Sequence, residues 1–167
     1  MQELTAELLK SVVHYEPETG VFTWIMRSGV SAGILRWNGR WPGKRAGSLN
    51  PRGYRAISLC GFKDLEHRLA WLYVTGRMPA DQIDHINGQK DDNRFANLRE
   101  ASNSENQINK PIYATNKSGF KGVSWHRGAQ KWQAFFGPKY LGLFTDIEDA
   151  AAAYSAAASS SQFVRIT

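Results

Sequence analysis

The 167-residue chain contains a single cysteine, Cys60, and no long apolar run. One thiol can form neither an internal disulfide nor a zinc site of paired cysteines, so we expect an intracellular protein with Cys60 as a small core residue. No stretch approaches the roughly 18 consecutive apolar residues of a membrane span, and the first residues lack the basic and then apolar start of a signal peptide. These absences predict a protein without a membrane partner.

Acidic residues are missing from two long stretches of a chain whose net charge is +6. Residues 27–55 contain seven Arg or Lys and no Asp or Glu, with Trp37 and Trp41 between them. Residues 107–144 contain six basic residues and no acidic one. Because Lys and Arg neutralise phosphates, both stretches favour nucleic-acid binding. An ordinary solvated loop is the alternative for the first stretch.

Hydrophobic periodicity and turn residues predict a mixed α+β fold. Thr5 has the character of a helix N-cap, and Gly76 has that of a helix end. In the first part of the chain we expect helices at residues 5–14 and 66–74, strands at 21–24 and 54–59, a hairpin partner after Gly61, and a long loop over 27–44.

The centre of the chain shows a different pattern. Two short strands, residues 82–86 and 98–101, flank a polar loop that has no apolar periodicity. Ser102 and Glu105 have the spacing of a capping box, so a helix is expected over residues 103–109. The predicted order is strand, loop, strand and helix.

Four polar residues of this centre carry the chemistry of phosphodiester hydrolysis. That reaction needs a base that activates water and a hard divalent cation that neutralises developing charge. His85 can be the base, and Asp84 with the amide oxygen of Asn106 can ligate Mg²⁺. Because neighbours on a strand face opposite sides, Asp84 and His85 act together only if the strand ends or bends there. Asn97 could accept a bond from the other ring nitrogen of His85 and fix its tautomer.

A longer series of motifs surrounds these residues. In order, they are His67-Arg68-Leu69-Ala70-Trp71, the turn from Gly76 to Pro79, Asp84-His85-Ile86-Asn87-Gly88, Asp92-Asn93-Arg94, Asn97-Leu98-Arg99 and Glu105-Asn106. The series resembles the HNH endonucleases, which have a ββα-metal fold, and especially their phage and intron-encoded branch. The leader from Leu4 to Trp24 also looks like that of phage proteins of this kind.

The resemblance implies that His85 is the general base, that Asn97 orients it, and that Asp84 and Asn106 bind one divalent metal. Many relatives have His at the position of Asn106, so the amide favours Mg²⁺ or Mn²⁺ over Zn²⁺. The sequence leaves two roles open. His67 could touch a phosphate or be a packed structural histidine, and Asn93 could pin the loop or touch the site.

The C-terminal part of the chain predicts a second compact fold. Strands are expected at residues 122–125, 131–136 and 139–144, followed by a helix that runs from a capping box of Thr145 and Glu148 to residue 158. The residues that carry a further resemblance are Gly122-Val123, Trp125, Trp132, Ala134, Leu141-Gly142, Phe144, Ala150-Ala151 and Ala153-Tyr154. They resemble the plant Apetala-two (ethylene-response-factor) DNA-binding domain, whose sheet lies in the major groove. The alternative is that one of the two tryptophans is a core residue.

The sequence thus predicts a nuclease domain at residues 1–110, a linker at 111–118 and a DNA-binding domain at 119–167. Within the first domain, residues 1–79 are a basic DNA-contacting part and residues 80–110 the ββα-metal core. The expected function is that of a metal-dependent DNA endonuclease of phage or homing type, which acts on double-stranded DNA in the cytoplasm of a bacterial host. Nicking or double-strand cutting, and monomer or homodimer, stay open. The expected DNA contacts are Arg36, Arg40, Lys44, Arg45, Arg52, Arg68, Lys121, Trp125, Arg127, Lys131, Trp132 and Lys139.

Two other functions compete with this interpretation. The first is a non-cleaving DNA-binding regulator or packaging accessory with a dormant HNH fold. The intact catalytic set argues against it, because a site free to drift would be expected to lose a residue. The second is an RNA-binding module, which the basic loops allow and which would display aromatic platforms for unpaired bases.

Overall fold

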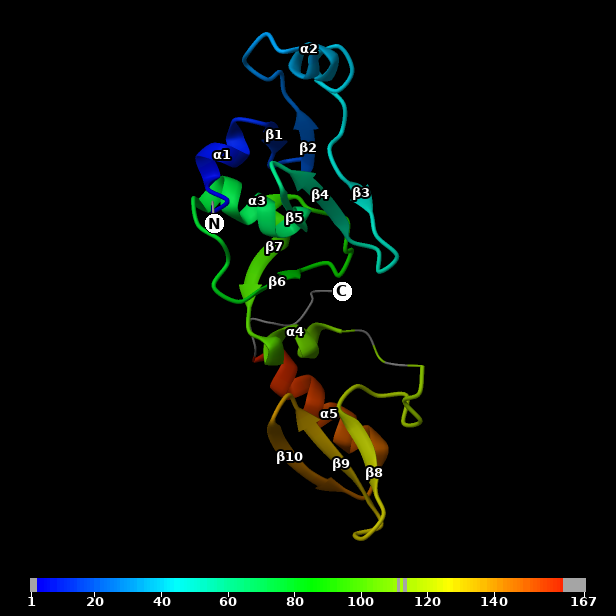
Figure 1. The fold of residues 1–167 in the computed structure, drawn as a ribbon. Helices are drawn as coiled ribbons and strands as arrows, with labels where there is room; N and C mark the ends of the chain where they lie inside the picture. The colour runs from blue at the N-terminus through cyan, green and yellow to red at the C-terminus, as the bar shows by residue number, and fades with distance from the viewer. Residues whose placement is uncertain (1–2, 111, 113, 161–167) are drawn as a thin grey trace. The chain divides into compact units, whose positions relative to one another are not determined.

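The computed structural model describes residues 3–110, 112 and 114–160, so part of the predicted linker lies outside the described residues. Helices and small antiparallel sheets give the mixed α+β fold that was expected (Figure 1). The chain divides into two compact units, residues 1–100 and 101–167. The predicted domain limits at residues 110 and 119 stay a prediction.

The N-terminal unit begins with a short helix and a hairpin. Helix α1 (Ala6–Lys10) starts where the Thr5 hydroxyl accepts the Leu8 N–H at 3.2 Å, as expected for an N-cap. The predicted helix to residue 14 is wrong, because β1 (Val13–Glu16) already alternates between buried and exposed side chains. That period of two is the pattern of a strand. β1 pairs antiparallel with β2 (Val21–Trp24), which makes a hairpin.

A helix interrupts the stretch that was expected to be a loop. α2 (Ala32–Asn38) is capped by the Ser31 hydroxyl, and none of its residues is buried. The Asn38 side chain exchanges two hydrogen bonds of 2.8 Å with the backbone of Arg27, whose guanidinium lies 3.6 Å from the Trp37 ring centre. The helix is therefore held by its ends, by this stacked pair and by the packing of Trp37 on Trp24 of the core. A single core contact is not a stripe that periodicity could reveal.

Three antiparallel strands and a helix form the middle of this unit. The strand order is β3 (Ser48–Leu49), β4 (Arg55–Leu59) and β5 (Phe62–Leu65), which confirms the hairpin after Gly61. Cys60 lies in the turn between β4 and β5, with φ at 49°, and is exposed, so the expectation that it is a core residue is wrong. α3 (Glu66–Thr75) ends at Gly76 in the left-handed conformation, as expected.

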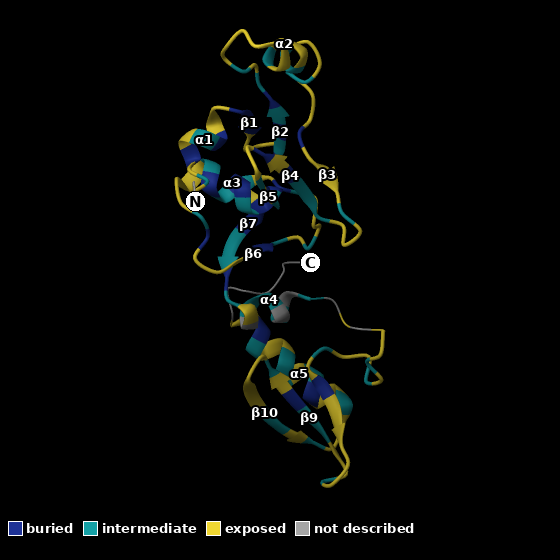
Figure 2. Ribbon diagram, viewed as in Figure 1, coloured by how far each residue is buried: buried dark blue, intermediate teal, exposed yellow. Residues whose placement is uncertain are grey.

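One hydrophobic core joins these elements. Leu9 of α1, Phe22 of β2, Ile57 of β4 and Leu69 of α3 are all fully buried within it (Figure 2). β6 (Gln82–His85) and β7 (Leu98–Ala101) form a separate two-stranded sheet, and the loop between them ends in a 3₁₀ turn, Phe95–Asn97. This sheet and loop carry the predicted catalytic residues.

The C-terminal unit starts with α4 (Asn103–Asn109). Its capping box is confirmed, because the Ser102 N–H donates to Glu105 at 2.7 Å and the Glu105 N–H donates to the Ser102 hydroxyl at 3.3 Å. The strands follow in the order β10 (Lys139–Phe144), β9 (Lys131–Phe136) and β8 (Val123–His126).

α5 (Ile147–Ser159) covers one face of this sheet, where its Ala150 packs with Val123 and Ala134. The second predicted capping box is wrong: the N-cap is Asp146, which makes no capping hydrogen bond with its side chain. Within the described residues, no helix is both long and apolar enough to cross a membrane.

Candidate active site

His85 is the last residue of β6, and the chain turns immediately after it. The Gly88 N–H donates to the His85 carbonyl at 2.8 Å, which closes that turn. Asp84 and His85 are both 5% exposed. The strand therefore ends where the sequence required it to end for the two side chains to serve one site.

Asn93 is the side chain that meets His85. Its Oδ1 lies 3.1 Å from Nε2 of His85, and its Nδ2 donates to Oε2 of Glu66 at 3.0 Å. The backbone carbonyl of Asn93 accepts the Tyr15 hydroxyl at 2.7 Å. Asn93 itself is 1% exposed. Three segments that are distant in sequence thus converge on one buried amide.

Asn97 has a different role from the one expected. Its Oδ1 accepts the Asn87 N–H at 2.9 Å, and its Nδ2 donates to Asn87 Oδ1 at 3.0 Å and to the Asp92 carbonyl at 2.8 Å. Asn97 closes the loop on itself, and the predicted hydrogen bond to His85 is made by Asn93. Both asparagines belong to motifs visible in the sequence, but the spacing could not say which amide reaches the ring.

Arg99 of β7 pairs with Asp84, a contact that the sequence analysis missed. Its Nη2 and Nε donate to Oδ2 of Asp84 at 2.8 and 3.1 Å. The pair is largely buried, with side chains 18% and 6% exposed. A buried carboxylate needs such compensation, and the adjacent, antiparallel β7 supplies it. The signal was present in the Asn97-Leu98-Arg99 motif, two residues from Asn97.

His67 and Tyr54 form an aromatic wall beside the base. The His67 and His85 rings meet edge to face with centres 4.9 Å apart, and the Tyr54 ring lies 5.4 Å from His67. Burial, together with the neighbouring His85 and Arg68, lowers the pKa of His67 to about 3. The burial and ring contacts of His67 favour the packed, uncharged histidine of the two alternatives that the sequence left open.

Burial also sets the protonation of the two residues that flank Asn93. It lowers the pKa of His85, although the Asn93 bond and the charge of Asp84 oppose the shift. It raises the pKa of Glu66 to about 7, against the opposing effects of Arg45 and Asn93. Oε1 of Glu66 is buried and has no hydrogen-bond partner among the described residues. His85 is consequently uncharged at neutral pH, as a base must be.

The predicted metal ligands differ in where they lie. Asp84 belongs to the first unit, whereas Asn106 lies on α4 in the second. Among the described residues no group of three or more His, Cys, Asp or Glu side chains forms a metal-binding cluster. The donors in question are a carboxylate and an amide, and oxygen ligands of this kind fit Mg²⁺ or Mn²⁺, which keep several waters.

The predicted DNA contacts of the first unit are mostly exposed. Arg36, Arg40, Lys44, Arg45 and Arg52 all reach solvent. Arg68 does not belong with them, because it is half-buried and pairs with Asp64 at 3.3 Å.

The candidate DNA contacts of the second unit differ in their exposure and their partners. The Lys121 ammonium donates to the backbone carbonyls of Ile108 and Lys110, so it contributes to the fold of this unit. Trp125 and Trp132 are paired across β8 and β9 and lie on the face of Val123 and Ala134, which α5 covers in part. Arg127, Lys131 and Lys139 are exposed.

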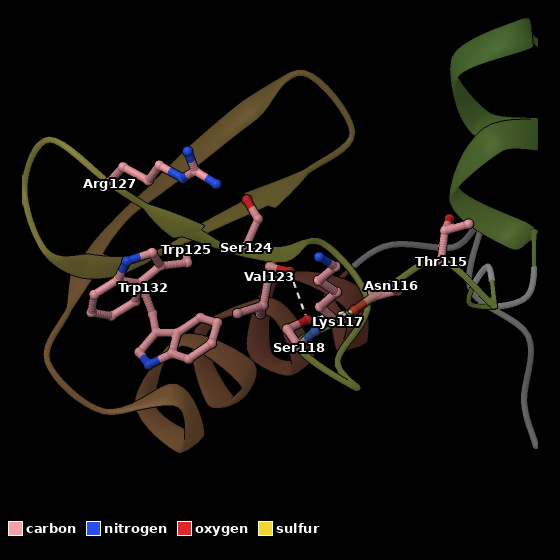
Figure 3. A pocket seen from close by; sticks show the side chains of 9 residues that line it. All are labelled: Thr115, Asn116, Lys117, Ser118, Val123, Ser124, Trp125, Arg127 and Trp132. Carbon is pink, nitrogen blue, oxygen red and sulfur yellow. Dashed lines mark hydrogen bonds between the residues drawn. The ribbon is translucent and has the colours of Figure 1, made fainter.

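A pocket of about 510 Å³ opens beside the two tryptophans (Figure 3). Among the described residues that line it, Lys117 and Arg127 are the cations and none is acidic. The outer face of the sheet exposes Phe135 and Tyr140, whose rings lie 5.2 Å apart and which sequence reasoning did not single out. The two faces of the sheet therefore present different aromatic side chains.

Comparison with known proteins finds similarity in the middle of the chain. Residues 64–108 match the family model described as HNH endonuclease. The chain is also similar to Protein 3.8 of Escherichia phage T7, with 35% identity over 68 residues. That similarity covers 40% of this chain and 56% of the phage protein, so it spans little more than half of the relative. No solved structure matches. The segment that holds Glu66, Asp84, His85 and Asn93 accordingly matches the HNH endonuclease family model, in a chain with a distant phage relative.

Proposed function

We propose that the protein is a metal-dependent DNA endonuclease that hydrolyses phosphodiester bonds with His85 as the general base. The observation that carries this proposal is the buried imidazole of His85, held by Asn93 beside the Asp84 carboxylate at the end of β6. Asn93 takes the orienting role that the sequence analysis gave to Asn97, and Asn97 supports it by closing the loop.

The reaction follows from the base. Nδ1 of His85 takes a proton from a water molecule as the water oxygen attacks the scissile phosphorus. The bond from phosphorus to the 3′ oxygen breaks, and this oxygen takes up a proton from solvent, which leaves a 5′-phosphate and a 3′-hydroxyl. Asp84, with Asn106 as the ligand expected from the motif, would hold one Mg²⁺ or Mn²⁺, whose charge stabilises the phosphorane and the leaving oxygen. Arg99 fixes Asp84 in place through Oδ2.

DNA binding would be divided between the units. In the first unit the exposed arginines and lysines around α2 neutralise phosphates, with Arg40 and Lys44 gathered over the Trp41 ring at 5.1 and 6.0 Å. In the second unit the cations of the tryptophan pocket, together with Lys131 and Lys139, supply further phosphate contacts. The long stretches without acidic residues support both assignments.

A supercoiled-plasmid assay in Mg²⁺ or Mn²⁺ tests the activity. We expect nicked or linear product that disappears with EDTA and with His85→Ala, and the form of the product separates nicking from double-strand cutting. A clear mobility shift of the plasmid without any product would favour the dormant DNA-binding alternative and remove support for His85. Stronger binding of single-stranded RNA than of duplex DNA would favour the RNA-binding alternative.

A further inference from the structure

We propose that Glu66 is a positioning residue that acts through Asn93 to hold His85 in the Nε2–H tautomer, and that the β1–β2 hairpin fixes the loop that carries Asn93. The inference rests on the proposed function, because it assigns to Glu66 the positioning of the general base of that function. Glu66 is the first residue of α3, and the hairpin lies before residue 64, where the match to the HNH family begins.

The orientation of the Asn93 amide determines which ring nitrogen carries the proton. Glu66 Oε2 accepts from the Nδ2 end of the amide, so Oδ1 is left to face His85. An amide oxygen only accepts hydrogen bonds, so Nε2 of His85 must donate. A neutral imidazole then carries its lone pair on Nδ1. The Glu66 carboxylate thereby sets the tautomer of His85 through the amide of Asn93.

Glu66 is well placed for this task. It is fully buried, and Nη2 of Arg45 lies 3.8 Å from the same Oε2 that accepts from Asn93. A nearby guanidinium favours the unprotonated state of that oxygen, so any proton on the carboxyl belongs on Oε1. Oε2 thus remains an acceptor in either charge state, and the amide of Asn93 keeps its orientation.

The hairpin holds the backbone on the other side of Asn93. The Tyr15 hydroxyl of β1 donates to the Asn93 carbonyl, and the Phe95 N–H donates to the Pro17 carbonyl at 3.0 Å. Gly20, in the turn between β1 and β2, packs directly on this backbone: a Cβ there would overlap Asn93 and Arg94. The amide is therefore fixed from its side chain by Glu66 and from its backbone by the hairpin.

The test compares two substitutions of Glu66. Glu66→Gln keeps an oxygen that can accept from Asn93, whereas Glu66→Met fills similar space without an acceptor. The tautomer is read from long-range ¹H–¹⁵N correlations of the imidazoles, with His85→Ala to assign the His85 signals among the four histidines. Cleavage is measured in parallel, and thermal unfolding checks that each variant is folded.

We expect the wild-type protein and Glu66→Gln to show the Nε2–H form and similar cleavage. Glu66→Met should show a mixture of tautomers and a fall in kcat of about tenfold or more, with KM within about twofold, because base positioning affects the chemical step. An Nδ1–H form in the wild-type protein would overturn the inference, even if Glu66→Met does not fold. So would an unchanged tautomer and kcat in Glu66→Met, or an equal loss in Glu66→Gln.

The two readouts separate this inference from the proposed function. The tautomer is measured without DNA or metal, so it can change in Glu66→Met even if the protein proves not to cleave DNA. That result would support the positioning role of Glu66 and contradict the nuclease function. If cleavage depends on His85 but the tautomer does not change in Glu66→Met, the result supports the nuclease function and contradicts the role of Glu66.

Discussion

Asn93 and Asn97 are chemically identical and lie in one loop, yet of the two only Asn93 forms a hydrogen bond with His85. The difference is geometric: Asn93 is placed between α3 and β6, whereas Asn97 bonds back to Asn87 and Asp92. A sequence motif gives the order of such residues but not the path of the loop that presents them. For this reason the sequence identified His85 and Asp84 but not the partners of either.

The Asp84–Arg99 pair predicts a large stability effect at a single residue. Arg99→Ala removes the guanidinium that pairs with the buried Asp84 carboxylate, so we expect a loss of about 3 kcal/mol in the free energy of unfolding. Arg77→Ala is the matched control, because Arg77 forms a two-pronged pair with Glu100 but is itself 55% exposed. Its loss should be clearly smaller, because an exposed ion pair contributes little to stability. Urea unfolding measures both, and equal losses would contradict the argument.

Glu66 predicts a pH dependence of stability. Its pKa is about 7 in the fold, against an ordinary value of 4.5, because burial disfavours the charged form. Between these values the folded protein binds more protons than the unfolded chain, so stability must fall as pH rises from 4.5 through 7. The fall has an upper bound of about 3 kcal/mol. Glu66→Gln should flatten that part of the profile in urea titrations, and an unchanged profile would show that another group is responsible.

At the scale of elements, the structure explains which predictions held. The capping box of α4, the β4–β5 hairpin and the end of α3 at Gly76 depend on neighbours in the sequence and were confirmed. The predicted length of α1 was wrong because Val12 and Val13 fit either the apolar stripe of a helix or a strand. Pairing with β2 places Val13 in a strand. α2 was missed because none of its residues is fully buried and only Trp37 packs against the core.

The β1–β2 hairpin gives a prediction about one turn. Gly20→Ala should lower both stability and cleavage, because the new Cβ pushes on the backbone of Asn93 and φ at 71° is strained for alanine. Gly61→Ala is the control: φ is 83°, but nothing lies within 4 Å of the added atom. It should show only the conformational cost of about 1 kcal/mol, with normal cleavage. If both variants cleave equally well, the hairpin does not support the site.

At the scale of the whole molecule, positive charge is the property that the sequence predicted best. Both stretches without acidic residues contain exposed cations. Those of the first stretch lie around α2, and those of the second lie on the C-terminal unit. Two of the candidate cations have local partners: Arg68 pairs with Asp64, and Lys121 bonds to backbone carbonyls. Composition predicts how much positive charge is present, but only the fold shows which part of it faces solvent.

Salt dependence tests the share of the second unit in DNA binding. Each phosphate contact contributes about −0.9 to the slope of log K against log salt concentration for duplex DNA. The double variant Lys117→Ala, Arg127→Ala should therefore make the slope less negative by about 1 to 2. Lys10→Ala, on α1 and 5.1 Å from the Tyr73 ring, is the control and should leave the slope unchanged. An unaltered slope in the double variant would remove the pocket from the DNA-binding surface.

The contact between the hairpin and Asn93 also bears on how such a domain can move between genes. The segment that matches the family begins at residue 64, but Tyr15 and Gly20 lie more than forty residues earlier. A recombination event that transferred only residues 64–108 would leave behind the tyrosine and the turn that hold the loop. Exchange that preserves cleavage should therefore carry the leader as well, with its joins before α1 rather than at the edge of the motif.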